Sequence, residues 1–337
     1  MKFSFERLCV AAVAAIALMS GGAFAQETRT AKLGHAHPME HAQAKAMIQF
    51  AQDVEAATNK RVKINVFHSA SLGGDDKQLQ AVQTGVQEFY IGALAPLAGK
   101  IQDVRIFDFP FMFNNLREVE YVFNGPVGRK ILDKLEPMGM VGLGWSHAGF
   151  RELSNRQRPV TKAEDIAGLK VRVMQNPVAL ETWKALGANA VPMSFSEVFT
   201  ALETGSLDGQ ENPLQHMHAN KMFEVQKYVT LTNHVYTPVT LLASKKFWDQ
   251  LTPADQDAVR KAAAGALALQ NKLIAEGDDK AIAELKKEGM TLTEMPPEEI
   301  AKLQAKVQPV VEKYTKEIGP EFVNEFRAEI EKARKAQ

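Results

Sequence analysis

Cysteine is almost absent from this 337-residue sequence, in which Cys9 is the single example. Cys9 lies within residues 1–25, which have the pattern of a secretory signal peptide, so the predicted mature chain has no thiol. This excludes disulfides, thiol catalysis and thiolate metal sites from that chain. A chain of this length can be stabilised by a hydrophobic core instead.

Excess charge of either sign is also missing. The sequence has 40 basic and 40 acidic residues, and removal of Lys2, Arg7 and Glu6 with the signal peptide leaves 38 and 39, a net charge of −1. No strongly basic surface is expected, so nucleic acid and anionic membranes are not predicted partners.

Several catalytic motifs are absent as well. The sequence contains no P-loop, no GxGxxG after a strand, no HExxH and no GxSxG. These absences lower the expectation of an enzyme and give no reason to expect a cofactor.

The first residues predict export. Lys2 and Arg7 form a basic start, Leu8 to Met19 form an apolar run, and Ala23-Phe24-Ala25 fits a cleavage site. The apolar run is too short to span a bilayer, although an uncleaved membrane anchor is the alternative. Cys9 does not lie at the cleavage site, so lipid attachment is not expected. We predict a periplasmic protein with a cleaved signal peptide that is not a lipoprotein.

Strands and helices alternate along the mature chain. Strands are expected at 30–35, 62–66 and 89–94, and a helix to about residue 58. A second helix is expected with Asp75 or Asp76 as its N-cap and Gly85 as its C-cap. The sequence at 81–85 resembles that at 201–205, in a similar strand–helix–strand setting. This pattern predicts an α/β fold with two similar halves and a parallel or mixed sheet.

No flexible linker separates the halves. Strands are expected at 141–145 and 228–242, a long helix capped by Thr252 runs to about residue 277, and amphipathic helix fills 296–335. The chain is expected to cross between halves near 145–150 and 235–240. Domain I would be 26–148 plus about 237–276, and domain II 149–236 plus about 277–337. A monomer is expected.

The stretch from 149 to 213 contains the main binding candidates. Arg172 lies in the strand-like Lys170–Val173, Arg151 follows Gly149-Phe150, and Asn212 precedes Pro213. A guanidinium group holds a carboxylate with two parallel hydrogen bonds, and a proline fixes the backbone of the residue before it. The alternative is a solvated strand face and a turn asparagine.

The histidines near the start of the mature chain do not predict a metal site. His37 and His41 lie four residues apart and would share a helix face, but Pro38 intervenes and no third ligand is evident. His216 and His218 give no further support.

Four segments together resemble the solute-binding subunits of tripartite ATP-independent periplasmic (TRAP) transporters. They are GFRELSNRQRPV, DIAGLKVRVMQNP, PMSFSEVFTALETGSLDGQENP and YVTLTNHVY, and the resemblance covers essentially the whole mature chain. It implies two α/β domains joined by crossing strands that act as a hinge, long bracing helices, and a ligand cleft between the domains, as in periplasmic binding proteins.

The resemblance also implies roles for residues. Arg172 would pair with the ligand carboxylate, Arg151 would support it, and Asn212 would contact the same end. The same position-by-position match implies that Gln175 and Phe195 line the pocket. The residues expected near the other end of the ligand are His35, His37, Trp145 and His147, with a core position as the alternative for Trp145.

The sequence departs from the sialic-acid-binding branch at Gly74 and Ala93, which argues against a large amino sugar acid. The predicted function is capture of a sugar acid, uronate or other hydroxycarboxylate for a TRAP permease. Alternatives are a C4-dicarboxylate or keto acid, a sensor or subunit of another importer, and a periplasmic enzyme.

Overall fold

One mixed sheet of nine strands runs through the whole protein. The computed structural model describes residues 28–336, and the predicted signal peptide lies outside them. The strand order is β2-β1-β3-β8-β4-β7-β5-β6, with β9 paired to β8. The strands are β1 (Arg29–Gly34), β2 (Val62–Phe67), β3 (Phe89–Gly92), β4 (Met140–Asn155), β5 (Lys170–Val173), β6 (Asn189–Pro192), β7 (Gly209–Asn212), β8 (Tyr228–Ser244) and β9 (Thr291–Glu294).

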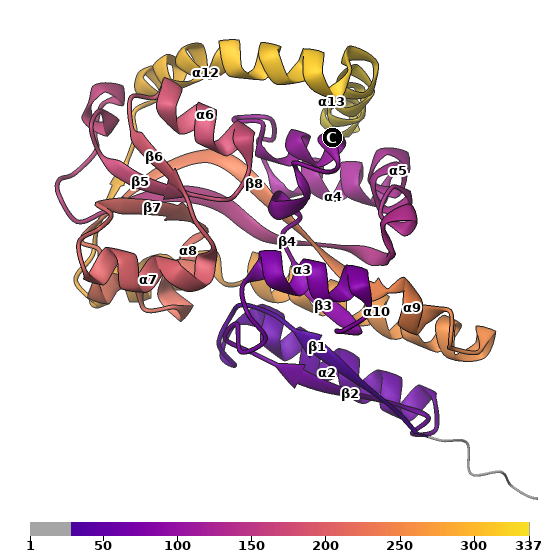
Figure 1. Ribbon diagram of the computed structural model, residues 1–337. Helices are drawn as coiled ribbons and strands as arrows, with labels where there is room; N and C mark the ends of the chain where they lie inside the picture. Colours follow the sequence, from indigo (N-terminus) through magenta and orange to yellow (C-terminus); the bar gives the residue numbers. More distant parts are fainter. Residues whose placement is uncertain (1–27, 337) are drawn as a thin grey trace, which may run out of the picture.

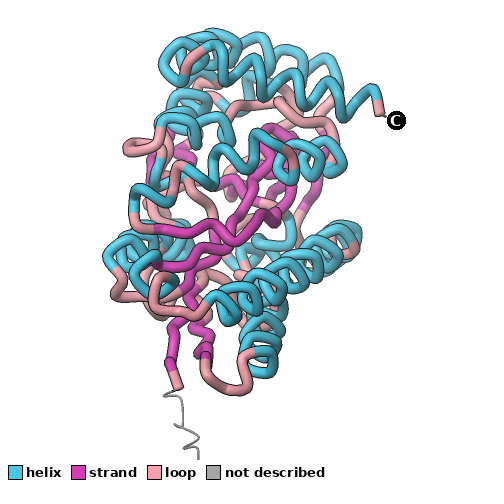
Figure 2. Tube along the Cα trace, turned by 90° about the vertical axis from the view of Figure 1, so that its right-hand side faces the viewer, coloured by secondary structure: helices cyan, strands magenta, loops and turns pink. Residues whose placement is uncertain are grey.

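Helices lie on both sides of this sheet, as Figure 2 shows. They are α2 (Ala42–Ala57), α3 (Asp75–Thr84), α4 (Leu116–Asn124), α5 (Pro126–Asp133), α6 (Pro177–Ala185), α7 (Phe195–Glu203), α8 (Leu214–Ala219), α9 (Lys245–Trp248), α10 (Pro253–Ala275), α11 (Asp278–Lys287), α12 (Pro297–Ile318) and α13 (Pro320–Lys335). No helix within 28–336 is long and apolar enough to cross a membrane.

Two long strands, β4 and β8, join two lobes (Figure 1). They pair antiparallel from Met140 opposite Ser244 to Asn155 opposite Tyr228. One end of this ribbon carries β1–β3, and we call this part with α2, α3, α4, α5 and α10 lobe 1. The other end carries β5–β7 and β9, and this part with α6, α7, α8 and α11 is lobe 2. The predicted α/β architecture with crossing strands is confirmed.

The repeated sequence motif corresponds to equivalent helix ends. Helices α3 and α7 are followed by Gly85 (φ 79°) and Gly205 (φ 73°), left-handed conformations that favour glycine. The start of α3 differs from the expectation, because Gly74 is the N-cap and Asp75 is the first helical residue. This shift places the Asp75 side chain in the first turn, where it borders the cavity described below.

The C-terminal helices brace both lobes. Helix α12 packs on α6, and α13 packs on α4 and α5 (Figure 1). The Phe326 side chain of α13 is fully buried, with ring centroids 5.8 Å from Phe113 and 6.2 Å from Phe123. Burial of such a ring contributes about 1.5–3 kcal/mol to stability. The predicted single stretch is two helices, because Gly319-Pro320 interrupts it. The division into domains remains a prediction, and α13 contacts the helices of lobe 1.

Candidate functional site

A cavity lies between the two lobes, with β4 and β8 behind it. Lobe 1 contributes the loop after β1, the first turn of α3 and the end of β3, and lobe 2 contributes β5, β7, α7 and α8. The cavity has a volume of about 50 Å³, counted as the space that the centre of a water molecule can occupy. One water needs roughly 10–15 Å³ by this measure, so the cavity accommodates a few non-hydrogen groups as it stands.

Arg172 presents a buried cation to this cavity. It lies on β5 with only 3% of its surface exposed, and its Nε and Nη2 donate to the Met193 carbonyl oxygen at 2.9 and 2.7 Å. Burial and the charge of Arg151 lower its pKa to about 10, so it stays protonated at neutral pH. Within 28–336 no carboxylate forms an ion pair with it, and Nη1 has no partner among the described side chains. Arg172 therefore lacks an anionic partner.

Arg151 also borders the cavity, but its charge is balanced. Its Nη2 donates to Glu211 Oε1 at 2.8 Å, its Nε donates to Glu211 Oε2, and its Nη1 donates to Thr237 Oγ1 at 3.2 Å. Burial favours the neutral carboxyl of Glu211, yet Arg151 and His234 outweigh this and lower its pKa to about 2. The structure thus brings both predicted arginines to the cavity. Arg151 is paired with Glu211, whereas Arg172 has no carboxylate partner within 28–336.

Asn212 lies at the end of β7 and lines the same cavity. Its side chain is 4% exposed, and its Nδ2 donates to Gln210 Oε1 at 2.5 Å. Gln210 Nε2 in turn donates to Ser154 Oγ at 2.8 Å. This chain of hydrogen bonds fixes the orientation of the Asn212 amide beside the two arginines.

Phe195 and His37 line the cavity as well. The Phe195 ring lies 5.9 Å from the Arg172 guanidinium carbon and 5.6 Å from the His37 ring. Phe195 belongs to α7 of lobe 2, and His37 precedes α2 of lobe 1. The aromatic contact thus spans the two lobes at the cavity.

Four of the predicted site residues lie outside the cavity lining. Trp145 and His147 project from the same face of β4, because side chains alternate along a strand, and that face packs on α4 and α5. Trp145 Nε1 donates to the Gly128 carbonyl oxygen at 3.2 Å, and His147 Nε2 is 4.0 Å from Glu120 Oε1. Their predicted ligand contact is corrected: Trp145 is a core residue, and Ala148 lines the cavity instead.

The other two are His35 and Gln175. His35 is fully buried at the end of β1, where burial and the neighbouring His68 lower its pKa to about 4. Gln175 is exposed after β5 has ended, and Met174 takes the place in the lining. Gln175 was predicted from the family resemblance alone, and in this structure it lies two residues beyond the end of β5 at Val173.

Asp75 is a cavity residue for which the sequence pattern predicted a helix cap. It is half-buried beside the cavity, and burial raises its pKa, while Tyr90 and Arg172 act in the opposite direction. His216 and Thr237 also border the cavity without having been predicted. The acidic pair after Gly73-Gly74 was the sequence feature that could have indicated Asp75 as a site residue. A carboxylate in the first turn of a helix is equally expected, however, because it stabilises the helix.

The lobes touch at the edge of the cavity. Ser194 Oγ of lobe 2 donates to Asp76 Oδ1 of lobe 1 at 3.3 Å. Gly74 lies at the same contact, where an added Cβ would lie 2.2 Å from Ser194 Oγ. The described arrangement of the lobes is therefore closed here, and residue 74 has no room for a side chain.

The sequence and the fold were compared with those of known proteins. Residues 33–317 match the model of the family described as bacterial extracellular solute-binding protein, family 7 (DctP). The chain belongs to this family. Its members are periplasmic substrate-binding proteins of TRAP transporters and are not enzymes.

Individual DctP-family proteins resemble the chain over most of its length. The sugar acid binding protein DctPAm of Advenella mimigardefordensis, solved with galactonate, is 40% identical with a TM-score of 0.89, over 91% of this chain and 99% of that one. A protein from Polaromonas, solved with D-erythronate, is 36% identical with a TM-score of 0.85, over 90% and 99%. The C4-dicarboxylate-binding protein DctP of Rhodobacter capsulatus is 34% identical over 88% of this chain and 90% of its own.

Proposed function

We propose that this DctP-family protein binds a small polyhydroxy monocarboxylate in the cavity between its lobes and delivers it to a TRAP permease. The observation that carries the proposal is Arg172, a buried cation without an anionic partner in 28–336. A ligand carboxylate would supply the missing negative charge. Its hydrogen bonds with Arg172 would be strong because both groups are ionised.

The charges around the cavity favour one carboxylate over two. Arg151 is already paired with Glu211, so Arg172 is the cation available to an anion. Asp75 adds a carboxyl group to the same lining, and this group would disfavour a second ligand carboxylate. The relatives solved with galactonate and D-erythronate support the same class.

Hydroxyl groups on the ligand would find partners around the cavity. Asp75, Asn212 and Thr237 each present a polar side-chain group to it. A site built from such groups rejects ligands that cannot pair with them, because unpaired buried polar groups are costly. The limited space with the lobes as described favours a short acid, and longer acids would require a wider separation of the lobes.

Opening and closing would occur at the crossing strands. The pairing of β4 with β8 shifts between His147 and Gly149, and Gly149 has φ 112°, which favours glycine. A bulge between two lobes is a suitable place for a hinge. We further propose a monomer in the periplasm, released by cleavage of a signal peptide in residues 1–25, without lipid attachment and without affinity for nucleic acid.

A thermal-shift screen followed by calorimetry tests the ligand class. Ligand binding raises the melting temperature by mass action. The panel contains erythronate, galactonate, glucuronate and succinate. We expect the largest shift in melting temperature from a polyhydroxy monocarboxylate. A clear preference for succinate would instead support the dicarboxylate function that DctP of Rhodobacter capsulatus represents.

A further inference from the structure

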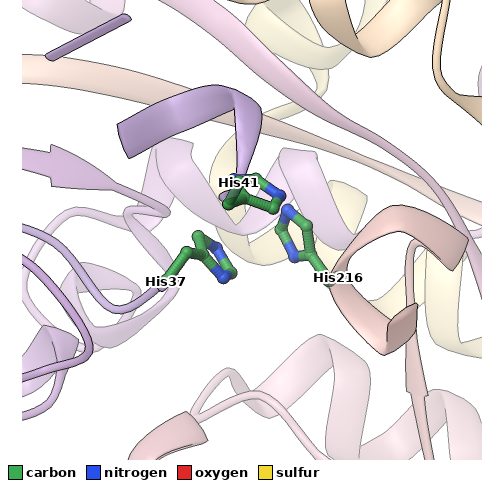
Figure 3. Close-up of side chains that lie close together, drawn as sticks. All are labelled: His37, His41 and His216. Atoms are coloured by element: carbon green, nitrogen blue, oxygen red, sulfur yellow. The ribbon is translucent and has the colours of Figure 1, made fainter. Parts of the chain in front are cut away.

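Three histidines meet at the contact between the lobes (Figure 3). His37 precedes α2, His41 is the N-cap of α2, and His216 lies on α8. The ring of His37 stacks on His41 at 4.2 Å and lies 4.0 Å from that of His216. All three side chains are more than nine-tenths buried, and His37 and His216 line the cavity that contains Arg172.

The hydrogen bonds of this cluster define the proton positions on two of the rings. The backbone N–H of Gln43 donates to His41 Nδ1 at 3.1 Å, so that nitrogen is an acceptor. Asn220 Nδ2 lies 3.3 Å from His37 Nδ1 and also donates to the His216 carbonyl oxygen at 2.8 Å. An amide nitrogen only donates, so His37 Nδ1 is an acceptor too. Both rings in their neutral form therefore carry the hydrogen on Nε2.

Burial keeps the rings neutral. It lowers the pKa of His41 to about 3, with smaller effects of His35 and Lys45, and it lowers the pKa values of His37 and His216 well below the ordinary range. The cluster thus presents neutral N–H donors at neutral pH.

A metal ion does not fit these donors. One ring nitrogen of each histidine lies within 4.8 Å of the others, which is close enough to suggest a metal site. A metal ion binds an unprotonated nitrogen, whereas Nε2 of both His37 and His41 is protonated here. Binding there would move two protons and break the hydrogen bonds from Gln43 and Asn220. The arrangement favours an oxygen acceptor over a cation.

We propose that His37 and His216 recognise the end of the ligand remote from its carboxylate, by donating hydrogen bonds to hydroxyl oxygens there. This inference rests on the proposed function and identifies residues that determine its specificity. His37 offers Nε2–H. In Figure 3 a nitrogen of His41 faces one of His216, and Nε2 of each is buried without a partner. The His216 ring is neutral as well, so one of its two nitrogens carries a hydrogen that it can donate. His41 and Asn220 are positioning residues.

Two acids that differ only at the far end provide the test. Erythronate and 2-hydroxybutyrate share four carbons, the carboxylate and the 2-hydroxyl, but the second lacks the 3- and 4-hydroxyls. Calorimetry on wild type, His37→Leu, His216→Leu and His216→Asn measures both acids. We expect each leucine variant to lose about tenfold or more in erythronate affinity and to keep its affinity for 2-hydroxybutyrate within about threefold. The asparagine variant, which still donates, should recover part of the loss.

Other outcomes separate the possible failures. Equal weakening of both acids in the leucine variants would contradict recognition of the far end, as would unchanged erythronate binding. A wild-type protein that binds neither acid, and no larger carboxylate in the panel, would contradict the proposed function itself. Micromolar Zn²⁺ binding that disappears in His216→Leu would overturn the donor assignment. Nitrogen-15 NMR of the histidine rings checks it independently, with Nε2–H expected for His37 and His41.

Discussion

Arg151 and Glu211 form a doubly hydrogen-bonded ion pair that is buried on both sides at the back of the cavity. His234 Nε2 lies 3.0 Å from the same carboxylate, which further fixes its orientation. The pair leaves Arg172 as the cation available to a ligand. We therefore propose separate roles for two arginines that look equivalent in sequence, one internal to the protein and one directed to the ligand.

Glu211→Gln tests the internal role of this pair. The substitution keeps the size of the side chain but leaves Arg151 buried without a counter-charge. We expect the free energy of unfolding to fall by about 3–5 kcal/mol, because an uncompensated buried charge is costly. Urea denaturation at neutral pH measures this loss.

The double variant Arg151→Met, Glu211→Gln is the matched control. It removes both charges, so stability should return to within about 2 kcal/mol of the wild type. It should also retain measurable binding of the ligand, since Arg172 is intact. Complete loss of binding in a folded double variant would show that Arg151 pairs with the ligand directly.

Gly74→Ala tests closure of the lobes. Gly74 has φ −69°, which alanine adopts freely, but the new Cβ would lie 2.2 Å from Ser194 Oγ across the lobe contact. We expect weaker ligand binding, by about tenfold, with little change in the melting temperature of the ligand-free protein. Calorimetry provides the affinity.

Two further variants show whether the clash is the cause. Gly99→Ala should leave affinity unchanged, since an added Cβ there has no atom within 4 Å. Adding Ser194→Ala to Gly74→Ala removes the Oγ atom and should restore part of the affinity. If Gly74→Ala binds as tightly as the wild type, the closed contact is not required for binding.

Glu152→Gln tests a buried carboxyl group in lobe 2. Burial raises the pKa of Glu152 to about 8, although the N–H groups of Asn233 and Thr232 act against this. Between the ordinary pKa of about 4.3 and this value, the folded state holds a proton that the unfolded chain has lost. The free energy of unfolding therefore decreases as pH rises through this window.

Glutamine cannot ionise and still offers an oxygen to both N–H groups. The wild type should lose more stability than the variant between pH 5 and pH 8, by on the order of 2 kcal/mol. Urea denaturation at both pH values measures the difference. Identical pH dependence in the two proteins would mean that Glu152 is ionised in the folded state.

Local patterns predicted most of the elements but not all of them. Alternation predicted β2, and the glycines after α3 and α7 marked their ends, since positive φ favours glycine. Helix α11 and the four-residue strand β9 were missed, because β9 is too short to show a period and depends on its pairing with β8. Gly319-Pro320 carried a signal for a helix break that the amphipathic pattern obscured.

The sequence predicted those site residues that belong to motifs of the family, but not the contacts that distant segments make in the fold. The family resemblance located Arg172, Arg151, Asn212, Phe195 and His37, all of which line the cavity. It did not reveal which face of β4 reaches the cavity, and so it misplaced Trp145 and His147. His216 was not recognised as a partner of His37, because 179 residues separate them and their meeting depends on closure of the lobes.

Calorimetry with Arg172→Ala is the most direct test of the central claim. Arg129→Ala, an exposed arginine on α5, is the control for the change in net charge. We expect Arg172→Ala to fold at least as stably without ligand, since a buried unpaired cation is removed. We also expect the affinity of Arg172→Ala for the carboxylate to fall by roughly 2–5 kcal/mol, while Arg129→Ala binds like the wild type. Equal affinity of Arg172→Ala and wild type for the ligand would show that Arg172 does not bind the carboxylate.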